Sequence, residues 1–105
     1  MGVLSNLQPE RVFYYFEEIC KIPHGSFHTD AISDYCMSFA RSHGLRARQD
    51  ASGNVVIWKD AAPGYDNGDT VILQGHLDMV CVKEDGCLLD LEKDGLRLVV
   101  EGDNV

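Results

Sequence analysis

The stretch of sequence that decides the fold is a short apolar run followed by a histidine and an aspartate, TVILQGHLDMV at residues 70–80. Residues 70–74 form a β-branched and apolar run bounded by Gly75, which is the pattern of a buried strand. In an open α/β sheet, ligands bind beyond the carboxyl ends of the strands. The pattern therefore predicts a buried central strand at Thr70–Gln74, with His76 placed just past its end.

His76 and Asp78 have the residue types and the spacing of a metal ligand and its orienting partner. Neutral imidazole is a good zinc ligand, and a carboxylate two residues later can curl back to accept the other ring N–H. That hydrogen bond fixes the tautomer and raises the basicity of the ligand, while Gly75 would let the backbone approach closely. A histidine in a lone His-x-Asp triplet is more often a hydrogen-bonded structural residue than a metal ligand, so the rest of the chain has to support a metal site.

The residues before this stretch predict two helices. Proline suits the start of a helix and cannot continue its end, so the first helix should lie between Pro9 and Pro23. The second should follow a cap at Ser26 or Thr29 and end at Gly44, which can adopt the left-handed conformation. Their apolar stripes, at helical spacing, are Val12, Phe16 and Ile19 in the first helix and Ile32, Tyr35, Cys36, Phe39 and Ala40 in the second.

A β-hairpin is expected next, because residues 45–49 alternate, residues 50–54 are rich in turn formers and residues 55–58 are β-branched or aromatic. Residues 61–69 contain proline, glycine and asparagine and predict an exposed loop. Residues 96–101 alternate again and run into a turn signal, with only Val105 after it. An open sheet edge is a poor stopping place for a domain, so we expect residues 1–105 to be an incomplete α/β domain with two helices, a β-hairpin and a mixed sheet.

Composition narrows the function classes. The 105 residues are 45% hydrophobic and 25% charged, as in ordinary globular domains. With 17 acidic against 9 basic residues the net charge is -8, which disfavours nucleic acid and anionic membranes as partners. The sequence contains no signal peptide and no apolar run of membrane-spanning length. We expect a cytoplasmic protein with its four cysteines reduced.

Several stretches together resemble one family, the aminoacyl-histidine dipeptidases, which form the carnosinase-like branch of the two-zinc peptidases. The likeness covers nearly the whole chain, and one departure is visible at residues 26–28, where Ser-Phe-His stands in place of the expected Ser-Gly-Asn. The stretches that carry the likeness are FEEICKIP (16–23), AISDY (31–35), QDASGNV (49–55), PGY (63–65) and QGHLDMV (74–80).

The resemblance implies that His76 binds one zinc ion and that the catalytic role of Asp78 is to orient this histidine without touching the metal. It also implies two zinc ions sharing a bridging water in the complete enzyme, with a glutamate that takes a proton from this water as it attacks the peptide carbonyl. The bridging aspartate, that glutamate and the other ligands match nothing in residues 1–105. The chain is therefore expected to be the N-terminal part of a catalytic metallopeptidase domain and to be inactive alone.

The resemblance makes a zinc-dependent dipeptidase acting on Xaa-His dipeptides the leading functional hypothesis, with a dipeptide as the substrate and room for a homodimer in the complete enzyme. A sibling two-zinc tripeptidase, carboxypeptidase or deacylase is the nearest alternative, because such enzymes also carry a His-x-Asp after a strand. A non-enzymatic interaction module that uses exposed strand edges is the alternative from another class.

Overall fold

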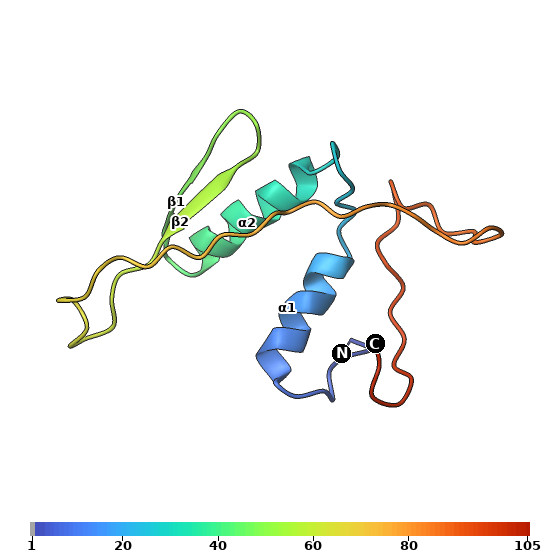
Figure 1. The fold of residues 1–105 in the computed structure, drawn as a ribbon, viewed down its shortest axis with the longest axis horizontal. Coiled ribbons are helices and arrows are strands. Elements are labelled where there is room, and N and C mark those ends of the chain that lie inside the picture. The colour runs from blue at the N-terminus through green and yellow to red at the C-terminus, as the bar shows by residue number, and fades with distance from the viewer. Residues whose placement is uncertain (1) are drawn as a thin grey trace. The chain divides into compact units, whose positions relative to one another are not determined.

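The computed structural model describes residues 2–105, which contain two helices and two strands in the order α1, α2, β1, β2 (Figure 1). The chain divides into two compact units. The first unit comprises the residues up to Ile32 together with residues 78–105, and the second comprises Ser33–Leu77. The elements confirm the expected α/β class, two helices and hairpin. Neither described helix has the length and apolar character needed to cross a membrane.

Helix α1 spans Glu10–Cys20 and begins and ends where the prolines predicted. Pro9 is its N-cap in an extended conformation, and the acidic side chain of Glu10 lies in the first turn, where the helix dipole favours it. Lys21 follows as the C-cap, two residues before Pro23. Cys20 is the buried residue of this helix, and burial, followed by the negative charge of Glu17, raises the pKa of its thiol above the ordinary value of 9.0.

Helix α2 spans Asp30–Ser42 and starts directly after Thr29, as the sequence predicted. Ile32 and Ala40 of its apolar stripe are buried. The helix ends in a Schellman motif: Gly44 has a φ of 66°, and the N–H of Leu45 donates to the carbonyl of Ala40 at 2.9 Å. Glycine at this position confirms the expected left-handed exit.

Strands β1 (Arg46–Gln49) and β2 (Val55–Trp58) pair antiparallel, which confirms the hairpin. Arg46 lies opposite Trp58, and its guanidinium carbon is 4.6 Å from the centroid of the indole ring. Trp58 therefore packs against its cross-strand neighbour within the hairpin through a cation–π contact.

The hairpin is tied to helix α2 through Ser33, which is 1% exposed. Its hydroxyl donates to the carbonyl of Gly53 at 2.6 Å and accepts from the amide of Gln49 at 2.7 Å. Gly53 has a φ of 86°, so the tip of the hairpin combines a left-handed residue with a buried hydrogen bond. The second unit is therefore organised by a polar contact between helix and turn.

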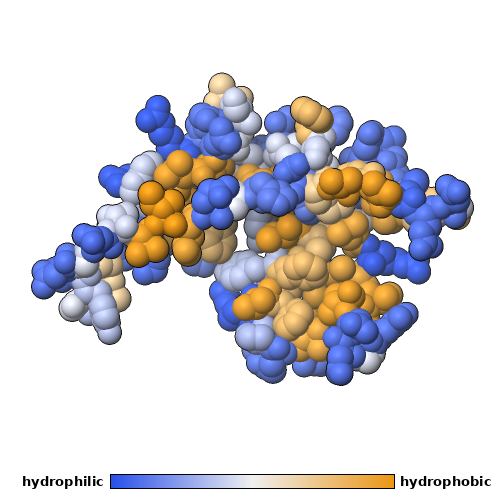
Figure 2. Space-filling model, in the orientation of Figure 1, coloured by the Kyte–Doolittle hydropathy of each residue, from blue (hydrophilic) through white to orange (hydrophobic). Residues whose placement is uncertain are grey.

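The prediction of a buried strand at Thr70–Gln74 is wrong for the structure described here. These residues adopt no regular secondary structure, and Val71, Ile72 and Leu73 are 79%, 84% and 93% exposed. Figure 2 shows apolar residues, in orange, at the surface of the face in view. A strand needs hydrogen-bonded neighbours and cover on its faces. The described residues form one two-stranded sheet, made by β1 and β2, in place of the expected mixed sheet.

The alternating residues 96–101 also form no strand. The turn that follows them is present, because Glu101 and Asn104 exchange backbone hydrogen bonds at 2.9 and 3.1 Å around Gly102, whose φ is 62°. The turn chemistry was therefore predicted correctly, while the strand was not. The expected loop at residues 61–69 is confirmed as exposed and without helix or strand.

Candidate functional site

His76 belongs to the second unit, at the end of the exposed run that begins at residue 70. Its side chain is exposed. Gly75 does not serve the close backbone approach that the sequence suggested, because a Cβ atom placed on it would meet no atom of the described residues within 4 Å. The histidine is thus accessible to an ion from solution.

Asp78 belongs to the first unit and is half-buried. Its carboxylate oxygen Oδ2 accepts a hydrogen bond from the hydroxyl of Ser26 at 2.5 Å. A hydroxyl bound to a carboxylate makes a charge-assisted hydrogen bond, which is shorter and stronger than a neutral one. The aspartate that the sequence identified is therefore held by a residue far away in the chain.

Backbone pairing brings the side chains of Ser26 and Asp78 together. Gly25 and Met79 form a parallel β-bridge. The N–H of Met79 donates to the carbonyl of His24 at 2.9 Å, and the N–H of Ser26 donates to the carbonyl of Met79 at 3.1 Å. These two backbone hydrogen bonds lie on either side of the Gly25–Met79 pair, and Ser26 and Asp78 are the chain neighbours of that pair, so the backbone holds the hydroxyl and the carboxylate close together.

The Ser26 hydroxyl projects from a tight turn at residues 25–28. The N–H of His28 donates to the carbonyl of Gly25 at 2.8 Å, and Phe27, the third residue of the turn, has a φ of 67°. Turns of this kind take glycine or asparagine at that position, and another residue is strained there by about 1–2 kcal/mol. The phenylalanine ring is fully exposed, so no packing of the ring offsets the strain.

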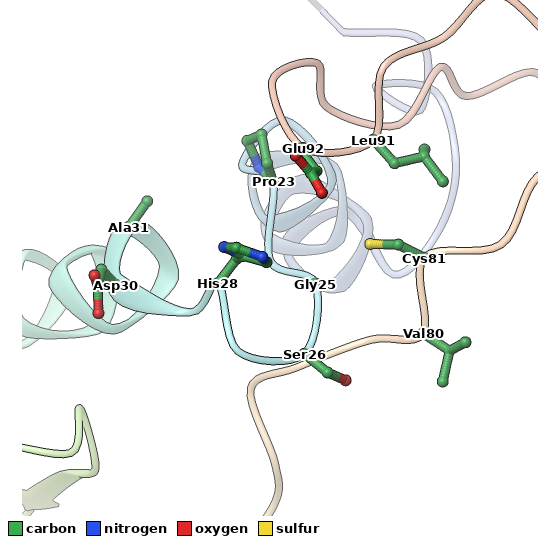
Figure 3. A pocket seen from close by; sticks show the side chains of 10 residues that line it. All are labelled: Pro23, Gly25, Ser26, His28, Asp30, Ala31, Val80, Cys81, Leu91 and Glu92. Carbon is green, nitrogen blue, oxygen red and sulfur yellow. The ribbon is translucent and has the colours of Figure 1, made fainter.

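This turn borders a cavity of about 400 Å³ in the first unit (Figure 3). The sulfur atom of Cys81 points toward Gly25, where an added Cβ would lie only 2.5 Å from it. The residues that line the cavity are Pro23, Gly25, Ser26, His28, Asp30, Ala31, Val80, Cys81, Leu91 and Glu92. Ser26 thus has Asp78 as its hydrogen-bond partner and a hollow beside it.

The residues described here fit part of a zinc site. Zinc takes three or four protein ligands, and His76 supplies one imidazole of the right chemistry. Within residues 2–105, no group of three or more histidine, cysteine, aspartate or glutamate side chains could hold a metal ion. All four cysteines are free thiols, in keeping with the expected reduced state.

The other histidines differ in surroundings. His43 follows the last residue of helix α2, and its Nδ1 lies 2.9 Å from the carbonyl of Phe39 in the last turn of that helix. His28 is exposed. His24 is buried, and its Nδ1 lies 2.6 Å from the carbonyl of Ile22. That partner makes it a structural histidine.

Sequence reasoning considered Ser26 only as a helix cap and missed its contact with Asp78. The two residues are 52 positions apart, and no local periodicity links them. A signal was nevertheless present, because the departure at residues 26–28 marked this loop as unusual. In the structure this departure includes the strained residue Phe27, which directly follows Ser26.

No protein-family model matches the chain. Among curated proteins, the cytosol non-specific dipeptidase of Escherichia coli (strain K12) is 36% identical over 103 residues, which cover 98% of this chain and 21% of the relative. Among solved structures, the aminoacylhistidine dipeptidase from Vibrio alginolyticus matches with a TM-score of 0.90 and 37% identity, covering 96% of this chain and 21% of that one.

The fold is that of part of a peptidase domain. Over nearly its whole length the chain is a homologue of dipeptidases, which are hydrolases, and the expected resemblance is confirmed. The chain spans about a fifth of the length of each of these two relatives.

Proposed function

We propose that this chain is the N-terminal part of the catalytic domain of a zinc-dependent dipeptidase that hydrolyses Xaa-His dipeptides. The observation that carries the proposal is the homology to dipeptidases over 98% of the chain, together with the His-x-Asp stretch at residues 76–78. A solved relative at 37% identity is an aminoacylhistidine dipeptidase, which supports the Xaa-His class of substrate.

In this proposal His76 is a zinc ligand and Asp78 orients its ring. An exposed imidazole at residue 76 can reach a metal ion, and a carboxylate held by another hydrogen bond is a suitable orienting group. Bound zinc would polarise the scissile carbonyl and acidify a water molecule. The remaining ligands and the general base would come from outside residues 1–105, so the chain alone should bind zinc weakly and hydrolyse nothing.

The experiment that tests the proposal compares the 105-residue chain with a chimera. In the chimera this chain replaces the homologous 103-residue segment of the Escherichia coli dipeptidase. The chain alone should be inactive, whereas the zinc-loaded chimera should hydrolyse an Xaa-His dipeptide such as carnosine. His76→Ala should abolish turnover of the chimera, and Asp78→Asn should lower it by ~10–100-fold, as removal of an orienting partner usually does.

A matched control is His43→Ala, which removes another exposed histidine outside the proposed site. It should leave turnover unchanged. Full activity of the His76→Ala chimera, or robust turnover by the short chain, would overturn the proposal. If the chimera does not fold, zinc titration of the short chain with and without His76 still tests whether this residue binds the metal.

Substrate breadth is decided by a panel of peptides. The Escherichia coli relative is named a non-specific dipeptidase, so the panel must include dipeptides without histidine. Preferential cleavage of Xaa-His supports the proposal, whereas cleavage of tripeptides, C-terminally trimmed peptides or acylated amino acids would favour a sibling hydrolase. A folded, zinc-loaded chimera that cleaves none of these would favour the interaction module.

We also propose that the protein works in the cytoplasm on a dipeptide substrate. The name of the Escherichia coli relative, a cytosol enzyme, supports this compartment. A net charge of -8 supports the absence of nucleic acid and anionic membranes among its partners. A homodimer of the complete enzyme stays a prediction, which sedimentation of that enzyme would test.

A further inference from the structure

The contact between Ser26 and Asp78 is a hydrogen bond from the serine hydroxyl to one of the two carboxylate oxygens. The donor is Ser26 Oγ, the acceptor is Asp78 Oδ2, and they are 2.5 Å apart with both residues half-buried. A carboxylate has two oxygen atoms and can rotate about its Cβ–Cγ bond. A hydroxyl that donates to one of these oxygens at a half-buried position restrains this rotation. It also occupies that oxygen with a hydrogen bond.

Backbone hydrogen bonds hold Ser26 close to Asp78 and so support the restraint on the carboxylate. The bridge between Gly25 and Met79 places the two strands of backbone side by side, and both Gly25 and His24 are buried. The hydrogen bonds from Met79 N–H to the carbonyl of His24 and from Ser26 N–H to the carbonyl of Met79 lie on either side of the Gly25–Met79 pair, next in the chain to Ser26 and Asp78. A side chain at position 26 is therefore presented to Asp78 whenever these backbone contacts exist.

The turn at residues 25–28 adds a second restraint. The N–H of His28 closes the turn by donating to the carbonyl of Gly25 at 2.8 Å, and Phe27 has a positive φ in it, which is an unusual conformation for this residue. Strained backbone of this kind concentrates at functional sites, where the surrounding structure holds it in place. Here the strained residue immediately follows the serine that binds Asp78.

We propose that Ser26 is a positioning residue, whose hydroxyl holds Oδ2 of Asp78 and so presents Oδ1 for the orienting role of that carboxylate. The inference rests on the proposed function, in which Asp78 orients a zinc ligand. Ser26 touches neither substrate nor metal in this scheme and acts only through Asp78. Its removal should loosen the carboxylate without disturbing the backbone bridge.

The first test uses the 105-residue chain and needs no activity. Three variants are compared with the parent chain: Ser26→Ala removes the hydroxyl, Ser26→Thr retains it, and Ser38→Ala makes the same truncation at an exposed site on helix α2. Side-chain coupling constants from NMR should show one Asp78 rotamer in the parent, in Ser26→Thr and in Ser38→Ala, and averaged rotamers in Ser26→Ala. Amide exchange at Met79 should be the same in all four proteins.

The second test measures zinc binding through the ring signals of His76 in the same proteins. Ser26→Ala should weaken the zinc association constant by ~10-fold, at the low end for loss of an outer partner, and Ser26→Thr should restore it. In the chimera described above, kcat should fall similarly with little change in KM.

The outcomes distinguish failure of the proposed function from failure of the positioning role of Ser26. If the parent chain binds no zinc at His76 and the chimera is inactive, the proposed function fails, while the rotamer measurement still decides whether Ser26 positions Asp78. An unchanged Asp78 rotamer in Ser26→Ala overturns the inference. So does faster Met79 exchange in that variant, or failure of Ser26→Thr to restore zinc binding, because either result assigns Ser26 a merely structural role.

Discussion

Ser26 Oγ lies 2.5 Å from Oδ2 of Asp78 and joins the loop after helix α1 to a segment 52 residues later in the chain. The same loop contains the one visible departure from the resemblance, at residues 26–28. These two facts belong together, because the serine makes the contact and the following phenylalanine takes the left-handed conformation for which glycine was expected. The loop is therefore the first place to test by mutation.

Phe27→Gly should stabilise the chain by about 1 kcal/mol, because glycine adopts a positive φ without strain and the exposed ring loses no packing. Urea unfolding of the two proteins measures the difference. The control is Phe27→Ala, which keeps a Cβ atom at a positive φ and should change the free energy of unfolding little. Equal stabilisation by both variants would show that the aromatic ring, and not the backbone, is the unfavourable feature.

Ser33→Ala should destabilise the second unit by about 1–3 kcal/mol, because it deprives the carbonyl of Gly53 and the amide of Gln49 of a partner. Ser33 is 1% exposed, so water cannot easily replace the hydroxyl. Ser38→Ala, on the exposed face of the same helix, is the matched control and should be nearly neutral. Similar unfolding curves for the two variants would contradict this account of how helix and hairpin are joined.

The hairpin turn should weaken in acid through Asp50. A hydrogen bond from the Asn54 side chain, followed by backbone N–H donors from Asn54, Ser52 and Gly53, holds the pKa of this carboxyl below its ordinary value of 3.8. A lowered pKa in the folded state means that the contribution to stability is present above pH 3.8 and is lost as the pH falls through the folded value.

The measurement for Asp50 is the free energy of unfolding as a function of pH, from neutral down to about pH 2, for the parent chain and Asp50→Asn. The parent should lose more stability in acid than the variant, because only the parent has a carboxylate to protonate in the turn. Parallel curves would show that the hydrogen bonds of this turn do not depend on the charge of Asp50.

The exposed run at residues 70–74 should make the chain self-associate. Extended apolar residues with unpaired backbone groups are a template for pairing with another chain, and Ile72 is 84% exposed. Ile72→Lys should reduce association, measured by light scattering over a range of concentrations. Tyr65→Lys is the control, because Tyr65 is also highly exposed but lies in the turn-rich loop before the run. Equal effects of the two lysines would point to net charge as the cause.

The sequence by itself determined the elements whose signals are local. Prolines set the limits of helix α1, Gly44 ended helix α2, and the turn residues 50–54 produced the hairpin, because each depends on contacts between residues close in the chain. The resemblance to dipeptidases was also readable from short stretches. The pattern at residues 70–74 was recognised as strand-forming, but a strand also needs neighbours, which periodicity cannot supply.

Only the tertiary structure decided how distant residues combine. It placed Met79 beside the loop at His24–Ser26 and gave Asp78 the Ser26 hydroxyl as a partner. It also buried His24 and exposed residues 71–73. The physical reason is that burial and hydrogen bonding between segments depend on which surfaces meet. The periodicity of the sequence does not reveal which distant segments form these contacts.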